Sequence, residues 1–466
     1  MRRVNCSWSS CLVVLLACSP GGGGASQTDG GTGESGGSSS AAESSSGNVP
    51  TTGGGVTEGS GEASSASASA SSSGASATTE ADETTTGSVC PTPGPFTASK
   101  LWVSSVSDGA LVKYDTDSLI EEARYYTDPL EDMDGSNPSR VAVDMDGRYA
   151  VVANRDAGTA TMIAADPADC IDRNGNGKIE TSTAGDQYFP FGEDECMVWH
   201  TPINEPFTDS AGLFATAWSP GVWDPQTCRH EGARVWIGWL VEEHRAALSR
   251  VDGVTGAVDS VVYIEDWPIT MIQYYGYSPH SAAVDVVGDV WTVPLVSDLL
   301  YRVDGETLAV EVFKSPVAES RHFGMAIDGA GRVWLPSFGG HGGVTVFDPE
   351  DASWTEISGM PVGEWRAVAI HPNGTAWVSA ETPCSLVEVD VATLKFVASH
   401  SYMNCVYPRG VSVDVQGRVW TVSYGSGVSR WDPLAQDDLW VEMFGGHESY
   451  GDMTGRGLYH VVYPDG

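Results

Sequence analysis

The sequence is poor in positive charge. It contains 24 Lys and Arg residues against 62 Asp and Glu residues, which gives a formal net charge of −38. Nucleic-acid binding needs a basic surface, so this balance excludes nucleic acid as a partner. It also argues against docking to anionic lipid. The acidic composition favours solubility outside the cell, or affinity for divalent cations and cationic ligands.

Common catalytic signatures are missing too. The chain has no G-x-S-x-G elbow, no Walker loop, no H-E-x-x-H and no C-x-x-C pair. Beyond the first residues, no segment is apolar enough to span a bilayer. The sequence alone therefore leaves open whether the protein is an enzyme.

The first 95 residues lack what a folded domain buries. No Lys or Arg occurs between Arg3 and Lys100, and no aromatic residue between Trp8 and Phe96. Residues 18–95 consist mainly of Gly, Ser, Thr and Ala, and such a segment cannot offset its ordering entropy. We expect a disordered tether there, with a reach of roughly 50 Å.

Residues 1–17 are typical of a signal peptide. Arg2 and Arg3 precede a short apolar core, which ends in Leu-Leu-Ala before Cys18. This ending resembles the lipobox of bacterial lipoproteins. The resemblance implies cleavage before Cys18 and lipidation of that cysteine; the alternative is ordinary cleavage near Ala25. A lipid-anchored protein of the cell envelope is expected, at the outer membrane or cell surface, with the lipid as its only membrane contact.

What the chain does contain is a repeat. One phrase recurs four times: HSAAVDVVGDVWTV, HFGMAIDGAGRVWLP, WRAVAIHPNGTAWVS and PRGVSVDVQGRVWTV. When the copies are aligned, they share a polar column, a Gly column and a Trp column, and successive members of each column are 43 residues apart. Their members are Asp285, Asp328, His371 and Asp414; Gly288, Gly331, Gly374 and Gly417; and Trp291, Trp334, Trp377 and Trp420. Short alternating strands at such a period predict the blades of a β-propeller.

The columns have structural explanations. A short polar side chain caps the turn that follows the innermost strand, Gly supplies positive φ, and Trp fills the space between sheets. A third strand ending in Asp appears seven times, which predicts seven blades. These ends are Asp115, Asp166, Asp252, Asp304, Asp348, Asp390 and Asp432.

An all-β, seven-bladed propeller is therefore expected over residues 96–466, with insertions near 167–211, 220–232 and 266–279. The chain ends in LYHVVYPDG, which matches a first strand and turn, whereas KLWVSS at its start matches a Trp strand. We expect the C-terminal strand to pair with the N-terminal blade and close the ring.

Six cysteines remain after the expected lipidation site. An even number in an exported protein suggests three disulfides, for which 15 connectivities exist. Proximity in the sequence favours Cys170–Cys196 and Cys384–Cys405, which leaves Cys90–Cys228.

One insertion resembles the first half of an EF-hand calcium loop. Asp172, Asn174 and Asn176 stand at alternate positions before a glycine, and the Lys178 carbonyl and Glu180 follow. Position twelve departs from the pattern, because Thr183 replaces the bidentate Glu; Asp186, Asp194 or Glu195 could supply the carboxylate. We expect structural Ca²⁺ here; the alternative is an Asx-rich turn without metal.

The second candidate site is the central funnel. Five residues before the polar column stand Ser139, His280, Phe323, Arg366 and Arg409, and His322 lies one residue earlier. Converging at one mouth, His280, His322, Arg366 and Arg409 would bind an anion or substrate. The alternative is that they satisfy strand ends or line a water-filled channel.

The repeats, with PHSAAVDVVGDVWTV and PRGVSVDVQGRVWTV as the clearest copies, resemble the seven-bladed propellers of virginiamycin B lyase and the related NHL type. In the lyases this implies elimination chemistry that uses His, Glu and Mg²⁺ in the funnel, with His280 and His322 as catalytic candidates. The Glu that follows Trp-aromatic-Thr in lyase blades is absent here. The leading hypothesis is therefore a module that binds a small molecule, glycan or protein, and the alternative is a metal-dependent lyase or hydrolase.

Overall fold

The computed structural model describes residues 89–129, 136–184, 187–204, 212–268, 278–317, 321–339, 343–425, 427–442, 446 and 448–464. All of them belong to the second of two compact units, Glu83–Gly466. The expected signal peptide, the lipidation site and residues 18–88 of the tether lie outside the described part.

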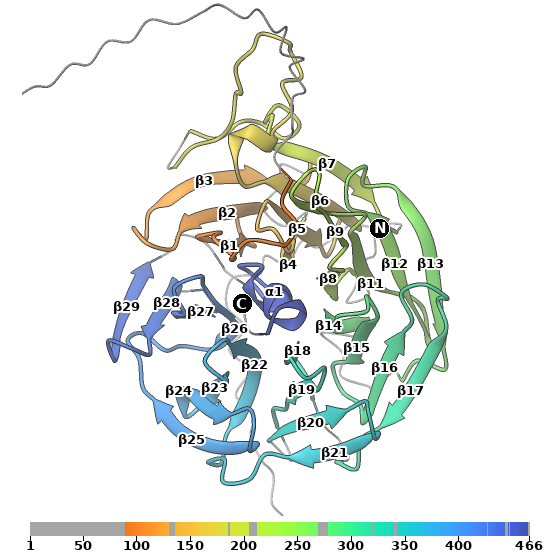
Figure 1. Ribbon diagram of the computed structural model, residues 1–466, viewed down its shortest axis with the longest axis vertical. Coiled ribbons are helices and arrows are strands. Elements are labelled where there is room, and N and C mark those ends of the chain that lie inside the picture. The colour runs from red at the N-terminus through yellow and green to blue at the C-terminus, as the bar shows by residue number, and fades with distance from the viewer. Residues whose placement is uncertain are drawn as a thin grey trace, which may run out of the picture. The chain divides into compact units, whose positions relative to one another are not determined.

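Seven antiparallel sheets stand in a ring, so the predicted seven-bladed β-propeller is confirmed (Figure 1). Blade one has three strands, β1 (Lys100–Ser105), β2 (Ala110–Asp115) and β3 (Glu121–Tyr126). Blade two comprises β4 (Pro138–Val143), β5 (Tyr149–Asn154), β6 (Thr159–Ala164) and β7 (Met197–Pro202). Blade three comprises β8 (Thr216–Trp218), β11 (Arg234–Glu242), β12 (Arg245–Asp252) and β13 (Val258–Glu265).

The other four blades follow the repeat. Blade four is β14 (Pro279–Val284), β15 (Val290–Pro294), β16 (Leu299–Val303) and β17 (Val310–Lys314). Blade five is β18 (Ala326–Ile327), β19 (Val333–Pro336), β20 (Val344–Asp348) and β21 (Ser353–Glu356). Blade six is β22 (Glu364–His371), β23 (Thr375–Thr382), β24 (Cys384–Asp390) and β25 (Lys395–His400). Blade seven is β26 (Pro408–Val413), β27 (Val419–Ser423), β28 (Gly427–Asp432) and β29 (Asp437–Glu442).

The polar column caps turns, as expected, and also holds the Trp column in place. In blade five the buried Asp328 carboxylate accepts hydrogen bonds from the backbone N–H groups of Ala330 and Arg332, both at 3.0 Å. Its second oxygen accepts from the indole N–H of Trp334 at 2.8 Å. Asp285 and Asp414 repeat the pattern in blades four and seven.

Blade six breaks this pattern. His371 accepts from the Asn373 N–H at 3.0 Å and bonds the Gly417 carbonyl through Nε2 at 2.8 Å. No acceptor is left for Trp377, whose buried indole N–H has no partner among the described residues. The Gly column supplies the positive φ that the turns require, from 80° at Gly417 to 95° at Gly288.

The strand expected at the C-terminus is wrong, because Arg456–Val462 form a helix, α1. The reason is Asp452, whose carboxylate accepts hydrogen bonds from the N–H groups of Thr454 (3.2 Å), Gly455 (2.9 Å) and Leu458 (2.9 Å). These bonds satisfy donors of the first turn that would otherwise be free.

Earlier residues of the C-terminal segment lie beside blade one instead. The Trp102 N–H of β1 donates to the Met453 carbonyl at 3.0 Å, and the Val141 N–H of β4 donates to the Tyr450 carbonyl at 3.1 Å. The segment thus runs between the innermost strands of blades one and two.

Helix α1 lies at the centre of the ring (Figure 1), on the face where the innermost strands end, here called the helix face. Leu458 and Val461 close an apolar cavity of about 80 Å³ lined by the innermost strands. The Tyr459 hydroxyl donates to the Gly94 carbonyl at 3.0 Å, and Tyr463 contacts His230, which also pairs with Asp146. Both ends of the described chain are therefore fixed on this face.

The three expected disulfides, Cys170–Cys196, Cys384–Cys405 and Cys90–Cys228, are present. They favour an oxidising, extracytoplasmic environment. The insertion at 220–232 forms a hairpin of β9 (Val222–Asp224) and β10 (Arg229–Glu231). Of the insertion at 266–279, residues 269–277 lie outside the described part. Among the described helices, none is both long and apolar enough to cross a membrane.

Candidate functional site

The innermost strands begin at the face opposite α1, here called the mouth. Several of them start with a register shift, between Pro138 and Arg140 in β4 and between Pro408 and Val411 in β26. Such irregularities re-aim side chains at the rims of sheets. Polar and aromatic side chains from blades two to seven meet at the mouth.

His280, at the start of β14, is at the centre of these contacts. Its side chain is buried, with ring centroids 5.0 Å from both Phe214 and Phe323 and 6.4 Å from Tyr450. Neither ring nitrogen has a hydrogen-bond partner among the described residues. Burial lowers the pKa of His280 well below its usual value, and the charges of four surrounding arginines lower it further. The imidazole is therefore neutral at physiological pH.

Arg366 and Arg409 meet beside it, as the repeat register predicts. Both pair with one carboxylate, Glu381, which the Arg409 guanidinium contacts at 3.1 Å. Both guanidinium groups also lie over the Phe323 ring, at 4.5 Å and 5.3 Å. Such cation–π contacts stabilise a charge away from water.

The other half of the mouth was not predicted. The Arg155 guanidinium pairs with Glu448 at 2.9 Å, and the Tyr450 hydroxyl donates to the same carboxylate at 3.1 Å. Burial opposes ionisation of Glu448, but the charge of Arg155 outweighs it, so the pKa of Glu448 falls below its usual value. Arg140 stacks on the Tyr450 ring at 3.7 Å.

Sequence signals for these residues were weak. Arg140 directly follows Ser139, the residue that counting from the polar column selected. Glu448 and Tyr450 lie outside the repeat, so no register placed them.

His322 does not join this group. Its Nδ1 bonds the Pro336 carbonyl at 3.1 Å, and burial lowers the pKa of His322 to about 4. No contact within the described residues links it to His280, Arg366 or Arg409. The structure thus brings three of the four predicted mouth residues together.

The calcium-like loop keeps its predicted side chains close together. One Asp172 oxygen accepts from the Gly175 N–H at 2.7 Å and the other from the Gly177 N–H at 2.8 Å. The side-chain amides of Asn174 and Asn176 both contact the Glu180 carboxylate. In these contacts the amide nitrogens donate to Glu180, whereas the Asn174 and Asn176 oxygens accept from the backbone N–H groups of Asn176 (3.0 Å) and Lys178 (2.8 Å).

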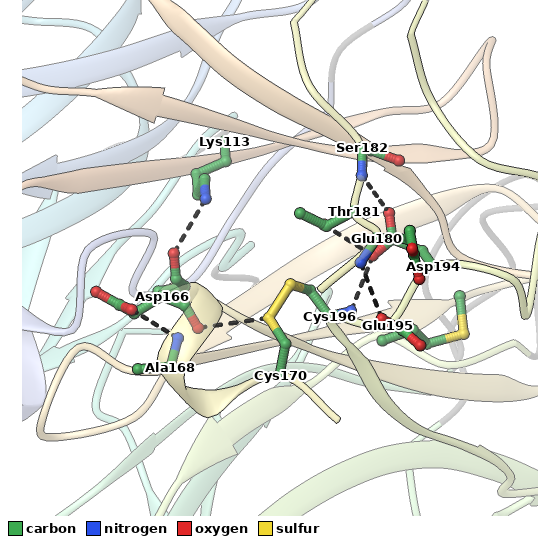
Figure 2. The surroundings of a disulfide bond; sticks show 12 residues. Lys113, Asp166, Ala168, Cys170, Glu180, Thr181, Ser182, Asp194, Glu195 and Cys196 are labelled. Carbon is green, nitrogen blue, oxygen red and sulfur yellow. Dashed lines mark hydrogen bonds between the residues drawn. A yellow bond between two sulfur atoms is a disulfide. The ribbon is translucent and has the colours of Figure 1, made fainter. Parts of the chain in front are cut away.

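Asp194 and Glu195 support this loop rather than complete it. Glu195 accepts from the N–H groups of Arg173 (2.9 Å) and Glu180 (2.8 Å), and Asp194 from that of Ser182 at 2.8 Å. Figure 2 shows both acids beside Cys196, where the disulfide with Cys170 joins the ends of the insertion. Within the described part of the chain, no cluster of three or more His, Cys, Asp or Glu side chains is arranged to hold a metal.

The ring of blades defines a seven-bladed β-propeller. No protein-family model and no curated protein matches the sequence. A protein of unknown function from Desulfotomaculum acetoxidans is similar in structure, with a TM-score of 0.51 and 11% identity over 75% of this chain and 98% of that one. Catalytically inactive virginiamycin B lyase from Staphylococcus aureus with quinupristin gives 0.47 and 10%, over 66% and 85%. Kuenenia stuttgartiensis hydrazine synthase gives 0.49 and 12%, over 69% and 91%. At these identities the likeness concerns the fold.

Proposed function

We propose that the protein is an extracytoplasmic binding module whose mouth holds a ligand, either a small molecule or part of a glycan or protein. The observation that supports this most directly is the state of His280 and Arg140. Both side chains are buried, and none of their ring or guanidinium nitrogens has a partner among the described residues. Buried polar groups are almost always hydrogen-bonded, so buried groups without a hydrogen-bond partner at the mouth favour a ligand that supplies one.

The metal-dependent lyase or hydrolase is the weaker alternative. A divalent metal at His280 would lie among four guanidinium groups, and like charges at such distances repel strongly. The expected partner, His322, bonds a backbone carbonyl instead. The acids of the mouth, Glu381 and Glu448, are engaged by arginines. Binding without catalysis does not require His322, Glu381 or Glu448 to leave these partners.

We also propose that the loop 172–180 binds Ca²⁺ as a structural ion. Asp172, Asn174, Asn176 and Glu180 would offer side-chain oxygens, and Lys178 its carbonyl. The support is the spacing of these residues and the closeness of Glu180, at position nine, to both asparagines, whose side-chain amides donate to its carboxylate. Bound there, Ca²⁺ would order the insertion that Cys170 and Cys196 enclose.

For the remainder of the chain we propose a lipid anchor at Cys18 and a cell-envelope location, at the outer membrane or cell surface. The support is the sequence Leu-Leu-Ala-Cys and the three disulfides of the folded unit. The long tether would let the propeller work at a distance from the membrane.

A test of the binding role is a thermal-shift screen of small molecules, glycan fragments and peptides against the purified full-length chain. Binding at the mouth should be lost in His280→Leu. It should survive in His400→Leu, which removes a partly buried His that lies between Trp377 and Trp431, away from the mouth. Ligands that stabilise wild type and His280→Leu equally would contradict the proposal.

A further inference from the structure

The arginines of the mouth differ in how far carboxylates balance their charge. Arg140, Arg155, Arg366 and Arg409 all lie within electrostatic range of His280. Glu448 pairs with Arg155, and Glu381 pairs with Arg366 and Arg409. Arg366 also pairs with Glu364 at 3.6 Å, and Asp156 lies within electrostatic range of Arg155. Three of the four arginines therefore have carboxylates beside them.

Arg140 is the arginine without a carboxylate. It is 2% exposed, and its Nε, Nη1 and Nη2 have no hydrogen-bond partner among the described residues. Its guanidinium plane lies on the Tyr450 ring at 3.7 Å, with Phe214 at 5.7 Å. Ring faces contact the flat side of a guanidinium and leave its edge donors free. Burial lowers the pKa of Arg140 to about 10, so the group remains charged at neutral pH.

A second side chain without a partner lies within electrostatic range of Arg140. It is His280, whose two ring nitrogens both lack a hydrogen-bond partner among the described residues. Each of these groups can donate to an oxygen atom, and Arg140 can donate from two edges at once.

We propose that the mouth binds an oxyanion with several acceptor oxygens, such as a phosphate monoester, a sulfate or a dicarboxylate, with Arg140 as its main donor. This inference rests on the proposed binding function and names the ligand class of that same site. The charge of the anion would pair with Arg140, and its oxygens would accept from the free donors of Arg140 and His280.

Glu448 would compete with the bound anion for the positive charge of the arginines. Its carboxylate is held by Arg155 at 2.9 Å and by the Tyr450 hydroxyl at 3.1 Å, and it lowers the positive potential around Arg140. A Glu448→Gln substitution keeps the size and an acceptor oxygen but removes the charge. It therefore adds one unit of positive charge to the surroundings of Arg140.

The test is calorimetric titration of the full-length chain with sodium sulfate, inorganic phosphate, succinate and acetate at constant ionic strength. We expect the three dianions to bind at least roughly tenfold more tightly than acetate. Arg140→Met should weaken dianion binding by more than tenfold, and Glu448→Gln should tighten it about tenfold. The matched control is Arg245→Met, which removes an arginine that stacks on Tyr263 at 4.2 Å in the outer strands of blade three. This control should bind like wild type.

The outcomes separate the two proposals. Equal affinity for acetate and the dianions, or weaker binding in Glu448→Gln, overturns the oxyanion assignment. If neutral molecules bind instead and His280→Leu abolishes their binding, the binding function stands and the oxyanion class fails. If neither anions nor the wider screen yields a ligand, both fail. Should Arg140→Met not fold, Arg140→Lys keeps the charge without the planar fork and is expected to bind dianions more weakly than wild type.

Discussion

Blades five and six differ in the hydrogen bond between the polar column and the Trp column, and this difference allows a quantitative prediction. Trp334 donates its indole N–H to the buried Asp328 at 2.8 Å, whereas the N–H of Trp377 has no partner among the described residues. Both side chains are at most 1% exposed. Substitution of each by Phe removes nearly the same apolar surface, so the packing loss nearly cancels in the comparison.

The polar contribution does not cancel. Trp334→Phe loses a hydrogen bond to a charged acceptor, worth about 1.5–3 kcal/mol. Trp377→Phe instead removes a buried, unsatisfied donor, whose burial destabilises the wild type by about 1–3 kcal/mol. We therefore expect Trp334→Phe to be less stable than Trp377→Phe by about 2.5–6 kcal/mol.

Urea unfolding of the full-length variants, followed by tryptophan fluorescence and by circular dichroism, measures this difference. Asp328→Ala combined with Trp334→Phe completes a double-mutant cycle, in which the two changes should be less than additive. Losses that agree within about 0.5 kcal/mol for the two Phe variants would refute the role assigned to the polar column.

Other predictions concern separate parts of the chain. Burial raises the pKa of Asp144 to about 7, so its charge destabilises the fold as pH rises from about 4 through 7; Asp144→Asn should be the more stable protein at pH 8 in denaturation experiments, and the difference should vanish at pH 4. Ca²⁺ should raise the melting temperature and EDTA should reverse this, whereas Asp172→Ala should abolish the response; an equal shift in the variant would contradict the calcium site. Deletion of residues 456–466 should lower the melting temperature sharply, because Leu458 and Val461 would no longer close the central cavity; an unchanged melting curve would show that α1 is dispensable. Cys18→Ser should prevent incorporation of labelled fatty acid, and undiminished labelling would rule out this anchor.

The fold could be predicted because its determinants repeat. Three columns 43 residues apart each have one local cause, a cap, a positive φ or a buried indole, and the cause acts the same way in every blade. The hydrogen bond from the Trp334 indole to Asp328 was not foreseen, although both residues stood in known columns, because the contact spans the turn between two strands.

The C-terminus shows where pattern reading fails. LYHVV is a short apolar run, and periodicity alone cannot separate a strand from a helix over so few residues. The helix is stabilised by Asp452, six residues before Leu458, which caps the first turn of α1. The match of LYHVVYPDG to the repeat contains no information on this cap, because Asp452 lies before the matched residues.

The mouth was predicted in part for a related reason. Counting back from the polar column located His280, Arg366 and Arg409, because their strands follow the repeat. In β4 the same count selected Ser139, whereas Arg140, the next residue, is the one that stacks on Tyr450. Glu448 belongs to the closing segment, which has no counterpart in other blades.

The attachment of the chain on the helix face has a mechanical consequence. The Cys90 N–H bonds the Pro225 carbonyl, and its sulfur is joined to Cys228 beside the β9–β10 hairpin. A pulling force applied through the residues before Cys90 would thus pass covalently into blade three before it reached β1. The strands of blade one, whose ring closure depends on noncovalent contacts with the C-terminal segment, would be shielded from that load.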